Sequence, residues 1–302
     1  MALIDLHEVS KIYGFGDATT LALDEVYLSV ERGEFVAIMG PSGSGKTTLM
    51  NIIGLLDRPS HGDYRLDGRH VSRLKSNQQA KQRRDRIGFV FQSYNLLPRL
   101  NVLENVALPL AYKGVTPVRR LKRASDILEL VGMREREYFM PRQLSGGQAQ
   151  RVTIARALVN NPGIIIADEP TGNLDSTDSR VLMELLAEIH RRGNTILLVT
   201  HNPELTRYAS RVIYMHDGMI VGDERTAVGQ LAKGVKRVYY KKHRLTDDDI
   251  VAGVSALMKK MPGREITTSL KRSKTKVRKR RSAKRRRTTK TVARKSTKRS
   301  GK

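Results

Sequence analysis

The sequence contains no cysteine and no long apolar segment. The absence of cysteine excludes disulfides, thiolate chemistry and cysteine-based zinc sites, although it says little about the redox compartment. No run approaches the roughly 18 apolar residues that a membrane-spanning helix needs. Residues 1–5 have neither a basic start nor a long apolar stretch, so we expect no signal peptide. The 302 residues are enough for about two domains and a sizeable core.

Acidic residues are scarce at the C-terminal end. Residues 229–302 hold 27 Lys/Arg against 4 Asp/Glu, whereas residues 1–228 hold 29 against 26. The net charge of +26 therefore comes almost entirely from residues 229–302, whereas residues 1–228 are nearly neutral. From residue 271 on, 18 of 32 residues are Lys or Arg and none is acidic. We expect 271–302 to be a disordered tail, because such a composition cannot bury a core.

Two kinds of partner suit this tail. An anionic membrane surface attracts each Lys or Arg by about 1 kcal/mol, and nucleic acid attracts them through counterion release. No aromatic residues alternate with the charges to stack on bases. A solvated tail with only weak contacts is the third possibility. Between body and tail, residues 226–270 are expected to form a linker with a short amphipathic helix that follows Thr246.

The stretch 35–48 has the strongest chemical signal. Its apolar start predicts a strand, its Gly/Ser-rich centre a loop, and the apolar spacing from Leu49 a helix. This is the pattern G-x-x-x-x-G-K-[ST] in the strand–loop–helix context that it requires. Loop N–H groups and the helix N-terminus bind phosphate, Lys46 reaches the outer phosphates, and the Thr47 hydroxyl ligates Mg²⁺. The residues predicted to form this phosphate-binding loop, and with it the nucleotide site, are Gly40, Pro41, Ser42, Gly43, Ser44, Gly45, Lys46, Thr47 and Thr48.

A second helix start suited to anions lies much further along the chain. Leu144 is followed by Ser145, Gly146, Gly147 and Gln148, and then by a helical apolar pattern. Ser145 is predicted to be the N-cap, with both glycines in the first turn. Exposed amides and a hydroxyl at a helix start form an anion site. An ordinary Ser-Gly-Gly helix start is the alternative.

Two acids follow a continuous apolar run at 164–167. Such a run is typical of a parallel strand that is covered on both faces. Ligands in these sheets bind at the carboxyl ends of strands, where Asp168 and Glu169 fall. We expect Asp168 to hold Mg²⁺ and Glu169 to orient or deprotonate a water molecule.

Three further residues are candidates for the same site. His201 follows a second buried strand, and we interpret it as a contact to the γ-phosphate. Gln92 ends a predicted strand at 87–91, where its amide could bind Mg²⁺ or water. Tyr13 is an aromatic residue that could stack on a nucleobase. Taken singly, each is more often an ordinary structural or surface residue.

Taken together and in this order, the motifs resemble those of an ATP-binding cassette protein, the nucleotide-binding subunit of an ABC transporter. The resemblance covers residues 1–225. The sequence at 54–57, 89–92 and 167–175 is similar to the subfamily of macrolide-exporter, lipoprotein-release and cell-division ATPases, which pair with FtsX-like permeases. It implies an α/β P-loop NTPase fold: a RecA-like core with an antiparallel β subdomain, and an α-helical signature subdomain over about 95–160.

The resemblance also implies a mechanism. Two chains would form a head-to-tail homodimer with two ATP molecules and Mg²⁺ at the interface. Ser145, Gly146, Gly147 and Gln148 of one chain would face the γ-phosphate held by Lys46 of the other. Glu169 would be the general base, His201 the γ-phosphate sensor and Tyr13 the adenine stack. Two residues depart from the family pattern: Thr153 stands where alanine is common, and Asn202 where aspartate is common.

Because no membrane span is predicted, the transporter interpretation requires a permease on a separate chain. Its cytoplasmic helices would be received near Gln92 and the helical subdomain, which places the ATPase in the cytoplasm on the inner face of the plasma membrane. One alternative is a soluble cassette ATPase that acts on nucleic acid through the tail. Another is a permease-linked cell-division regulator without transport. The short segment between Lys46 and Ser145 lacks the coiled coil of DNA-repair cassettes, which favours a membrane role.

Overall fold

The computed structural model describes residues 2–14 and 19–226. The chain divides into two units, 1–246 and 247–302. The expected linker, its amphipathic helix and the basic tail lie outside the described residues, so the domain boundaries near 225 and 270 stay predictions.

A six-stranded sheet forms the centre of the described region, in the order β10-β9-β3-β8-β7-β6. Five strands run parallel and β10 pairs with β9 antiparallel. Both faces are covered, since β3 sends Phe35 and Ala37 to one core cluster and Val36 and Ile38 to the other. The strand bounds are β3 Phe35–Met39, β6 Ile87–Phe91, β7 Ile164–Asp168, β8 Thr195–Val199, β9 Arg211–His216 and β10 Met219–Arg225.

A second, antiparallel sheet packs beside it in the order β2-β1-β4-β5. Its strands are β1 Ala2–Tyr13, β2 Thr20–Glu31, β4 His61–Leu66 and β5 Arg69–His70. Buried and exposed side chains alternate along much of β2, as expected of a strand with one solvated face. This sheet and one face of the central sheet share a core cluster with α1, Lys46–Ile53.

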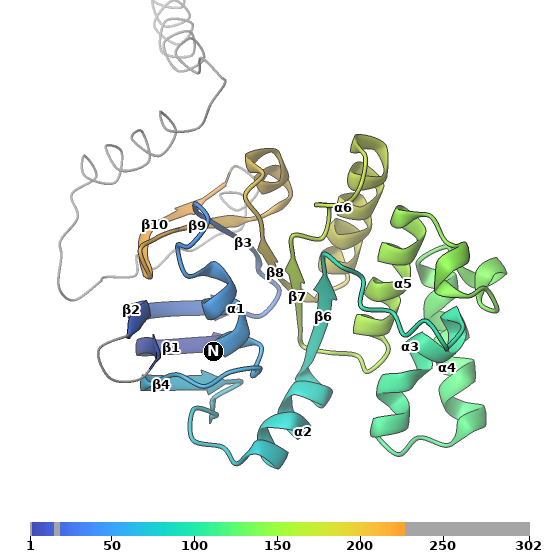
Figure 1. Ribbon diagram of the computed structural model, residues 1–302, viewed down its shortest axis with the longest axis horizontal. Helices are drawn as coiled ribbons and strands as arrows, with labels where there is room; N and C mark the ends of the chain where they lie inside the picture. Colours follow the sequence, from blue (N-terminus) through green and yellow to red (C-terminus); the bar gives the residue numbers. More distant parts are fainter. Residues whose placement is uncertain (1, 15–18, 227–302) are drawn as a thin grey trace, which may run out of the picture. The chain divides into compact units, whose positions relative to one another are not determined.

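The opposite face of the central sheet carries most of the helices (Figure 1). Four helices belong to this part of the described chain: α3 Val102–Tyr112, α4 Pro117–Leu130, α5 Gly146–Leu158 and α6 Ser176–Arg191. Short 3₁₀ helices cover 134–136, 141–143 and 203–208. Helix α2, Ser76–Arg86, has only Gln79 buried, which explains why apolar periodicity does not predict it.

A buried ion cluster ties β9 and β10 to the strands beside them. Arg211, whose side chain is 8% exposed, donates to Asp223 at 2.7 and 2.6 Å and to Glu34 at 3.2 Å. It also donates to the Ser29 carbonyl at 2.8 Å. The turn after β9 contacts the phosphate loop, since the Gly218 amide donates to the Ser44 carbonyl. The ion cluster therefore supports the strand pair against which that loop rests.

We expect Arg211→Met to lower the free energy of unfolding by about 3 kcal/mol, because it leaves the largely buried Asp223 carboxylate without its cation and Glu34 with Arg225 alone. Urea unfolding of the full chain measures this change. The matched control is Arg191→Met on α6, whose ion pair with Glu188 is exposed and should matter by less than about 0.5 kcal/mol. Equal effects of the two substitutions would contradict the role given to the cluster.

Candidate functional site

The phosphate loop joins β3 to α1 as the sequence predicts. Gly40 and Gly45 both have positive φ, at 155° and 94°. A Cβ on Gly40 would lie 2.3 Å from the Met215 carbonyl oxygen, and one on Gly45 would lie 2.6 Å from that of Ala22. The loop therefore needs glycine at both positions for two reasons, backbone conformation and close packing. The buried β3 and the two neighbouring backbones fix its curvature.

Lys46 begins α1 and folds back over this loop. Its Nζ donates to the carbonyl oxygens of Gly40 and Pro41 at 2.9 and 2.8 Å. Burial lowers the pKa of the Lys46 ammonium, and the charges of Glu169 and Asp168 partly oppose that shift. The ammonium and the two carboxylates thus share one electrostatic environment.

Asp168 ends β7 and Glu169 follows it, at the same edge of the sheet as the phosphate loop. Burial raises the pKa of Asp168, the neighbouring Glu169 adds to this, and Lys46 opposes it. Glu169 has a left-handed φ of 45°, which is uncommon for a non-glycine residue. Such strain persists where surrounding contacts fix it, and it is often found at functional sites.

Contacts from the end of β8 hold the Glu169 carboxylate. It accepts from the His201 backbone N–H at 2.9 Å and pairs with His201 Nδ1 at 2.7 Å. The Thr200 hydroxyl donates to its second oxygen at 3.3 Å. The His201 side chain is 73% exposed, whereas that of Glu169 is only 18% exposed. The imidazole therefore lies at the outer rim, with the carboxylate behind it.

Gln92 follows β6 and is linked to the loop after β7. Its Nε2 donates to Asn173 Oδ1 at 3.4 Å, and Asn173 Nδ2 donates back to the Gln92 carbonyl at 3.1 Å. A Cβ on Gly172 would lie 2.5 Å from the Gln92 amide nitrogen, so the two loops are closely packed. Gln92 and the predicted acids thus lie on adjacent strand ends.

Ser145 caps α5 as predicted. Its hydroxyl accepts from the Gln148 N–H at 3.3 Å, and the Gln148 side chain accepts from the Ser145 N–H at 3.1 Å. Gly147 has no room for a side chain, since a Cβ would lie 2.3 Å from an Asp178 carboxylate oxygen. This helix start lies on α5, against the core cluster opposite that of α1.

Two side chains of α5 that sequence patterns did not mark as functional hold the Gln92 loop. Buried Gln150 donates to the carbonyls of Phe91 at 3.1 Å and Pro170 at 2.9 Å. Arg156 donates to the carbonyls of Asn95 at 2.6 Å and Tyr94 at 2.8 Å. Sequence reasoning could have found Gln150 and Arg156, because each is a polar residue inside an otherwise apolar helical pattern.

The two departures from the family pattern are structurally satisfied. The Thr153 hydroxyl is buried and donates to the Gln150 carbonyl at 2.8 Å. Asn202 caps the 3₁₀ helix at 203–208, because its side chain accepts from the Glu204 N–H at 2.9 Å. An aspartate at this position would supply the same acceptor.

Tyr13 ends β1 and is 39% exposed. Its hydroxyl donates to Asp57 Oδ2 at 2.8 Å, and Lys11 donates to Asp57 Oδ1 at 2.8 Å. The Lys11 ammonium also lies 4.7 Å from the centre of the Tyr13 ring. Burial works against ionisation of Asp57, but hydrogen bonds from Lys11, Tyr13 and the Arg58 backbone outweigh it and lower its pKa. Lys11 and Asp57 were not predicted, because the contact joins residues far apart in sequence.

The donors at the strand ends fit Mg²⁺. Among the described residues no cluster of three or more His, Cys, Asp or Glu side chains could hold a metal by itself. Mg²⁺ does not need one, because it binds through one or two protein oxygens together with water and substrate phosphates. The Thr47 hydroxyl, the Gln92 amide oxygen and the Asp168 carboxylate are oxygen donors of that kind.

Comparison with known proteins identifies the family. The family model described as ABC transporter matches residues 23–172. An ABC transporter ATP-binding protein of Bacillus subtilis is 49% identical over 223 residues, which is 74% of this chain and 97% of that protein. The chain belongs to the ABC transporter ATP-binding family. It is an ATPase cassette homologous to the ATP-binding subunits of transporters, and cassettes of this family hydrolyse ATP.

Further relatives place the cassette among larger proteins and solved structures. It is 51% identical over 221 residues to the macrolide export ATP-binding/permease protein MacB of Marinobacter nauticus, covering 73% of this chain but 34% of MacB. The dimeric structure of the ABC transporter cassette MJ0796 is 46% identical, with a TM-score of 0.68 over 74% of this chain and 98% of that one. A second MJ0796 dimer, 45% identical, holds ADP and Pi in a post-hydrolysis state. These likenesses confirm the predicted cassette fold.

Proposed function

We propose that two copies of this cassette close head to tail around two Mg²⁺–ATP molecules, and that hydrolysis drives a membrane permease on a separate chain. The observation that carries this proposal is the position of the two anion-binding helix starts. Lys46 begins α1, in the core cluster under the antiparallel sheet, and Ser145 caps α5, in the cluster on the opposite face.

The central sheet lies between these two helices (Figure 1). A phosphate chain cradled by Gly40–Lys46 therefore cannot reach Ser145–Gln148 of the same copy. A second copy, turned head to tail, supplies the missing helix start. Each copy then contributes one half of each of the two nucleotide sites, and the bound ATP molecules join the two copies. The dimeric MJ0796 structures, one with the products ADP and Pi, support this arrangement.

The strand-end residues then have distinct roles in hydrolysis. Thr47, Gln92 and Asp168 would hold Mg²⁺, which would neutralise phosphate charge. Glu169 orients a water molecule and accepts its proton as the new oxygen–phosphorus bond forms and the bond to the ADP oxygen breaks. His201 at the outer rim contacts the γ-phosphate. Positioning and charge neutralisation supply most of the rate in phosphoryl transfer.

We expect Glu169→Gln to lower ATP turnover by about 10²- to 10³-fold, because an amide keeps the shape but cannot accept the proton. The slowed enzyme should accumulate as an ATP-bound dimer, which size-exclusion chromatography with light scattering detects. Glu184→Gln, on the exposed surface of α6, is the matched control and should behave like the wild type. A monomeric Glu169→Gln protein with full turnover would refute the proposal.

We also propose that Asp57 is a positioning residue for the base. The Tyr13 ring stacks on adenine, the Lys11 ammonium occupies one side of the ring, and Asp57 holds both. Asp57 lies four residues after the end of α1, the helix that begins with Lys46. One helix therefore connects the phosphate contact and the base contact.

A double-mutant cycle tests this role. Tyr13→Phe and Asp57→Asn should each weaken ATP binding by about 5-fold, because each loses or weakens the hydrogen bond that holds the Tyr13 ring, worth about 1 kcal/mol, while the ring itself stays. The double variant should be little worse than either one, because both remove the same contact. Saturating kcat should stay unchanged. Titration with a fluorescent ATP analogue measures binding, and fully additive losses would show that the two residues act independently.

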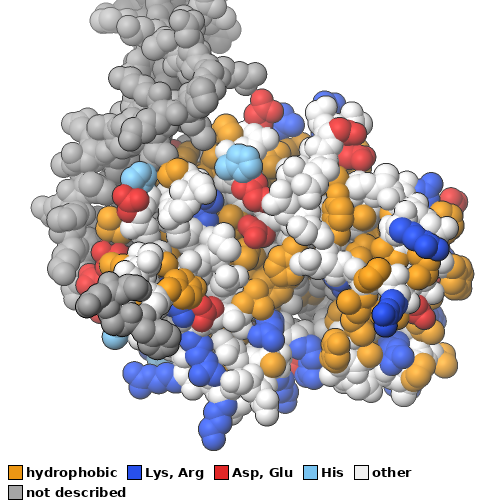
Figure 2. Space-filling model, viewed as in Figure 1, with side chains coloured by type: hydrophobic (Ala, Val, Ile, Leu, Met, Phe, Trp, Pro, Cys, Tyr) orange, Lys and Arg blue, Asp and Glu red, His pale blue; other side chains and the backbone are white. Residues whose placement is uncertain are grey.

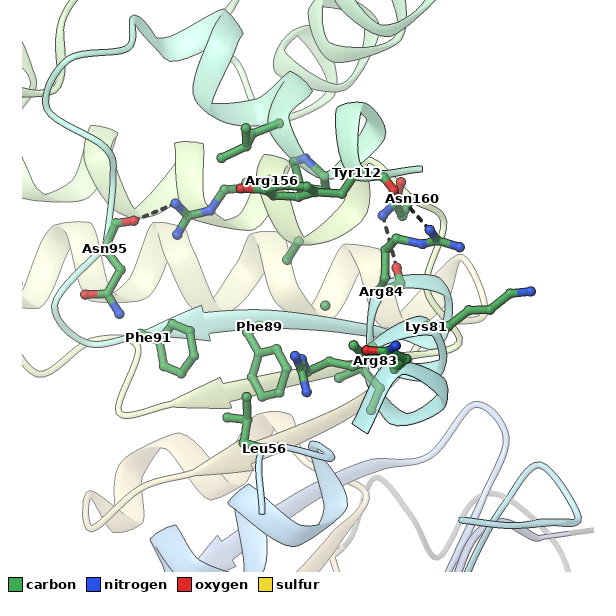
Figure 3. A pocket seen from close by; sticks show the side chains of 17 residues that line it. Leu56, Lys81, Arg83, Arg84, Phe89, Phe91, Asn95, Tyr112, Arg156 and Asn160 are labelled. Carbon is green, nitrogen blue, oxygen red and sulfur yellow. Dashed lines mark hydrogen bonds between the residues drawn. The ribbon is translucent and has the colours of Figure 1, made fainter. Parts of the chain in front are cut away.

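A groove of ≈ 980 Å³ beside α2 is the proposed docking site for cytoplasmic helices of the permease. Figure 3 shows side chains from α2, β6, α3 and α5 around it, including Phe89, Tyr112 and Arg156. Its apolar residues give an amphipathic helix a surface to bury. Arg156 also holds the backbone of Tyr94 and Asn95, just after Gln92. A helix in the groove would therefore contact a side chain that fixes the Gln92 loop.

We expect Tyr112→Ala to abolish most stimulation of ATPase activity by a coexpressed FtsX-like permease, while the basal rate stays unchanged. Tyr112 is 71% exposed in the groove, so its loss should remove a docking contact without disturbing the core. Tyr138→Ala is the matched control, because Tyr138 is 72% exposed and outside the groove. Equal stimulation of both variants would exclude the groove as the docking site.

The subfamily and the location follow from the same proposal. The MacB relatives are described as ATP-binding/permease proteins, and the cassette matches only about a third of their length. No helix among the described residues could cross a bilayer. We therefore infer an FtsX-like permease partner and a position on the inner face of the plasma membrane. Attraction of the tail to anionic lipid or nucleic acid rests on sequence alone and stays a prediction.

A further inference from the structure

The connection from β5 into α2 presents four exposed cations, Arg69, Arg73, Lys75 and Lys81, which we call the basic face. Within residues 2–14 and 19–226, none of these four groups lies within salt-bridge distance of a carboxylate, and only Arg69 and Lys81 act on acids at longer range, on Asp67 and Asp85. Three of them lie within seven consecutive residues, and Lys81 follows on α2. The basic face is therefore one compact surface.

The charge of this region is not balanced locally. Residues 58–86 hold nine Lys/Arg and three Asp/Glu. All three acids are already engaged: Asp63 with His70, Asp67 with Arg86, and Asp85 with Arg84. The remainder of residues 1–228 holds 20 Lys/Arg and 23 Asp/Glu, so the rest of the body is slightly acidic. Residues 58–86 thus carry a net excess of six positive charges, and helix α4 adds a shorter run of four Lys/Arg at 119–123.

Helix α2 connects the basic face to the groove. Asn77, Lys81 and Arg84 of α2 line the groove. Figure 3 shows Lys81 extending from α2 away from the pocket, whereas Arg84 turns back toward Tyr112. In Figure 2, Lys and Arg side chains gather along the lower edge, over α2 and its surroundings. The excess charge thus borders the place where a membrane protein is proposed to dock.

We propose that the basic face binds the headgroups of anionic phospholipids. The orientation of the basic face toward the membrane rests on the proposed function, because a permease segment in the groove brings α2 toward the bilayer. The contact itself needs no permease, because Lys and Arg side chains on flexible stems are attracted to an anionic surface within a Debye length of about 10 Å. Residues 69–81 contain no Phe or Tyr on which bases could stack, which favours lipid over nucleic acid.

The absence of cysteine gives a direct test in the full chain. The variant Ser76→Cys carries a fluorophore at the start of α2, and vesicles carry a lipid with a nitroxide quencher on its headgroup. We expect quenching of this label on vesicles containing phosphatidylglycerol and none on pure phosphatidylcholine. Neutralising Arg69, Arg73 and Lys75 to Gln should raise the lipid needed for half-quenching by about ten-fold or more. A fluorophore on Glu184→Cys, in α6, should stay unquenched.

The label reports only on its own surroundings, so vesicle binding by any other part of the chain does not mimic the result. Equal quenching of the neutralised and wild-type chains would overturn the proposal. Protection of the position-76 label by duplex DNA, without quenching on anionic vesicles, would assign the face to nucleic acid and also overturn it. Tyr112→Ala should leave the quenching unchanged, because the vesicles hold no permease. Failure of the docking proposal and failure of the lipid proposal are thus separate outcomes.

Discussion

A sheet buried on both faces separates the two helix starts that the proposed mechanism brings to one phosphate chain. Apolar side chains alternate between the two core clusters along β3, so α1 and α5 are fixed to opposite sides. The loop before Lys46 and the cap at Ser145 cannot be brought together without breaking that core. If both helix starts act on one phosphate chain, as proposed, the fold therefore requires a dimer. The same sheet brings Asp168, Glu169 and His201 to the edge where the phosphate loop lies.

The loop after Gln92 is the point where three functional parts of the cassette meet. Asn173 ties it to the loop that follows the acids, and Gln150 and Arg156 tie it to the signature helix. Tyr94 and Asn95 in this loop both have left-handed φ, at 55° and 50°, which their neighbours must hold in place. Because Arg156 also lines the groove, a helix docked there as proposed would share one set of contacts with the nucleotide edge.

Sequence patterns predict the cassette fold and its motifs well, because each motif depends on local chemistry. The strand before Gly40, the cap at Ser145 and the acids at the end of β7 all follow from periodicity and spacing over a few residues. Helix α2 does not follow from periodicity, since its polar sequence leaves almost no apolar stripe. The Lys11–Asp57–Tyr13 contact is not predictable from local patterns either, because residues 44 to 46 positions apart meet only after β1 and α1 have packed.

The uneven charge of the body gives a physical reason for the polar sequence of helix α2. A helix that buries little apolar surface contributes little to the core, so its composition is free to serve an exterior contact. Here Arg83 bonds the Leu55 carbonyl and Arg84 bonds the Tyr112 carbonyl, and these two contacts help to seat the helix. Lys75 and Lys81 form no ion pair within the described part of the chain. The helix thus joins an apolar groove to an unbalanced cationic surface, a combination that fits a membrane boundary better than bulk solvent.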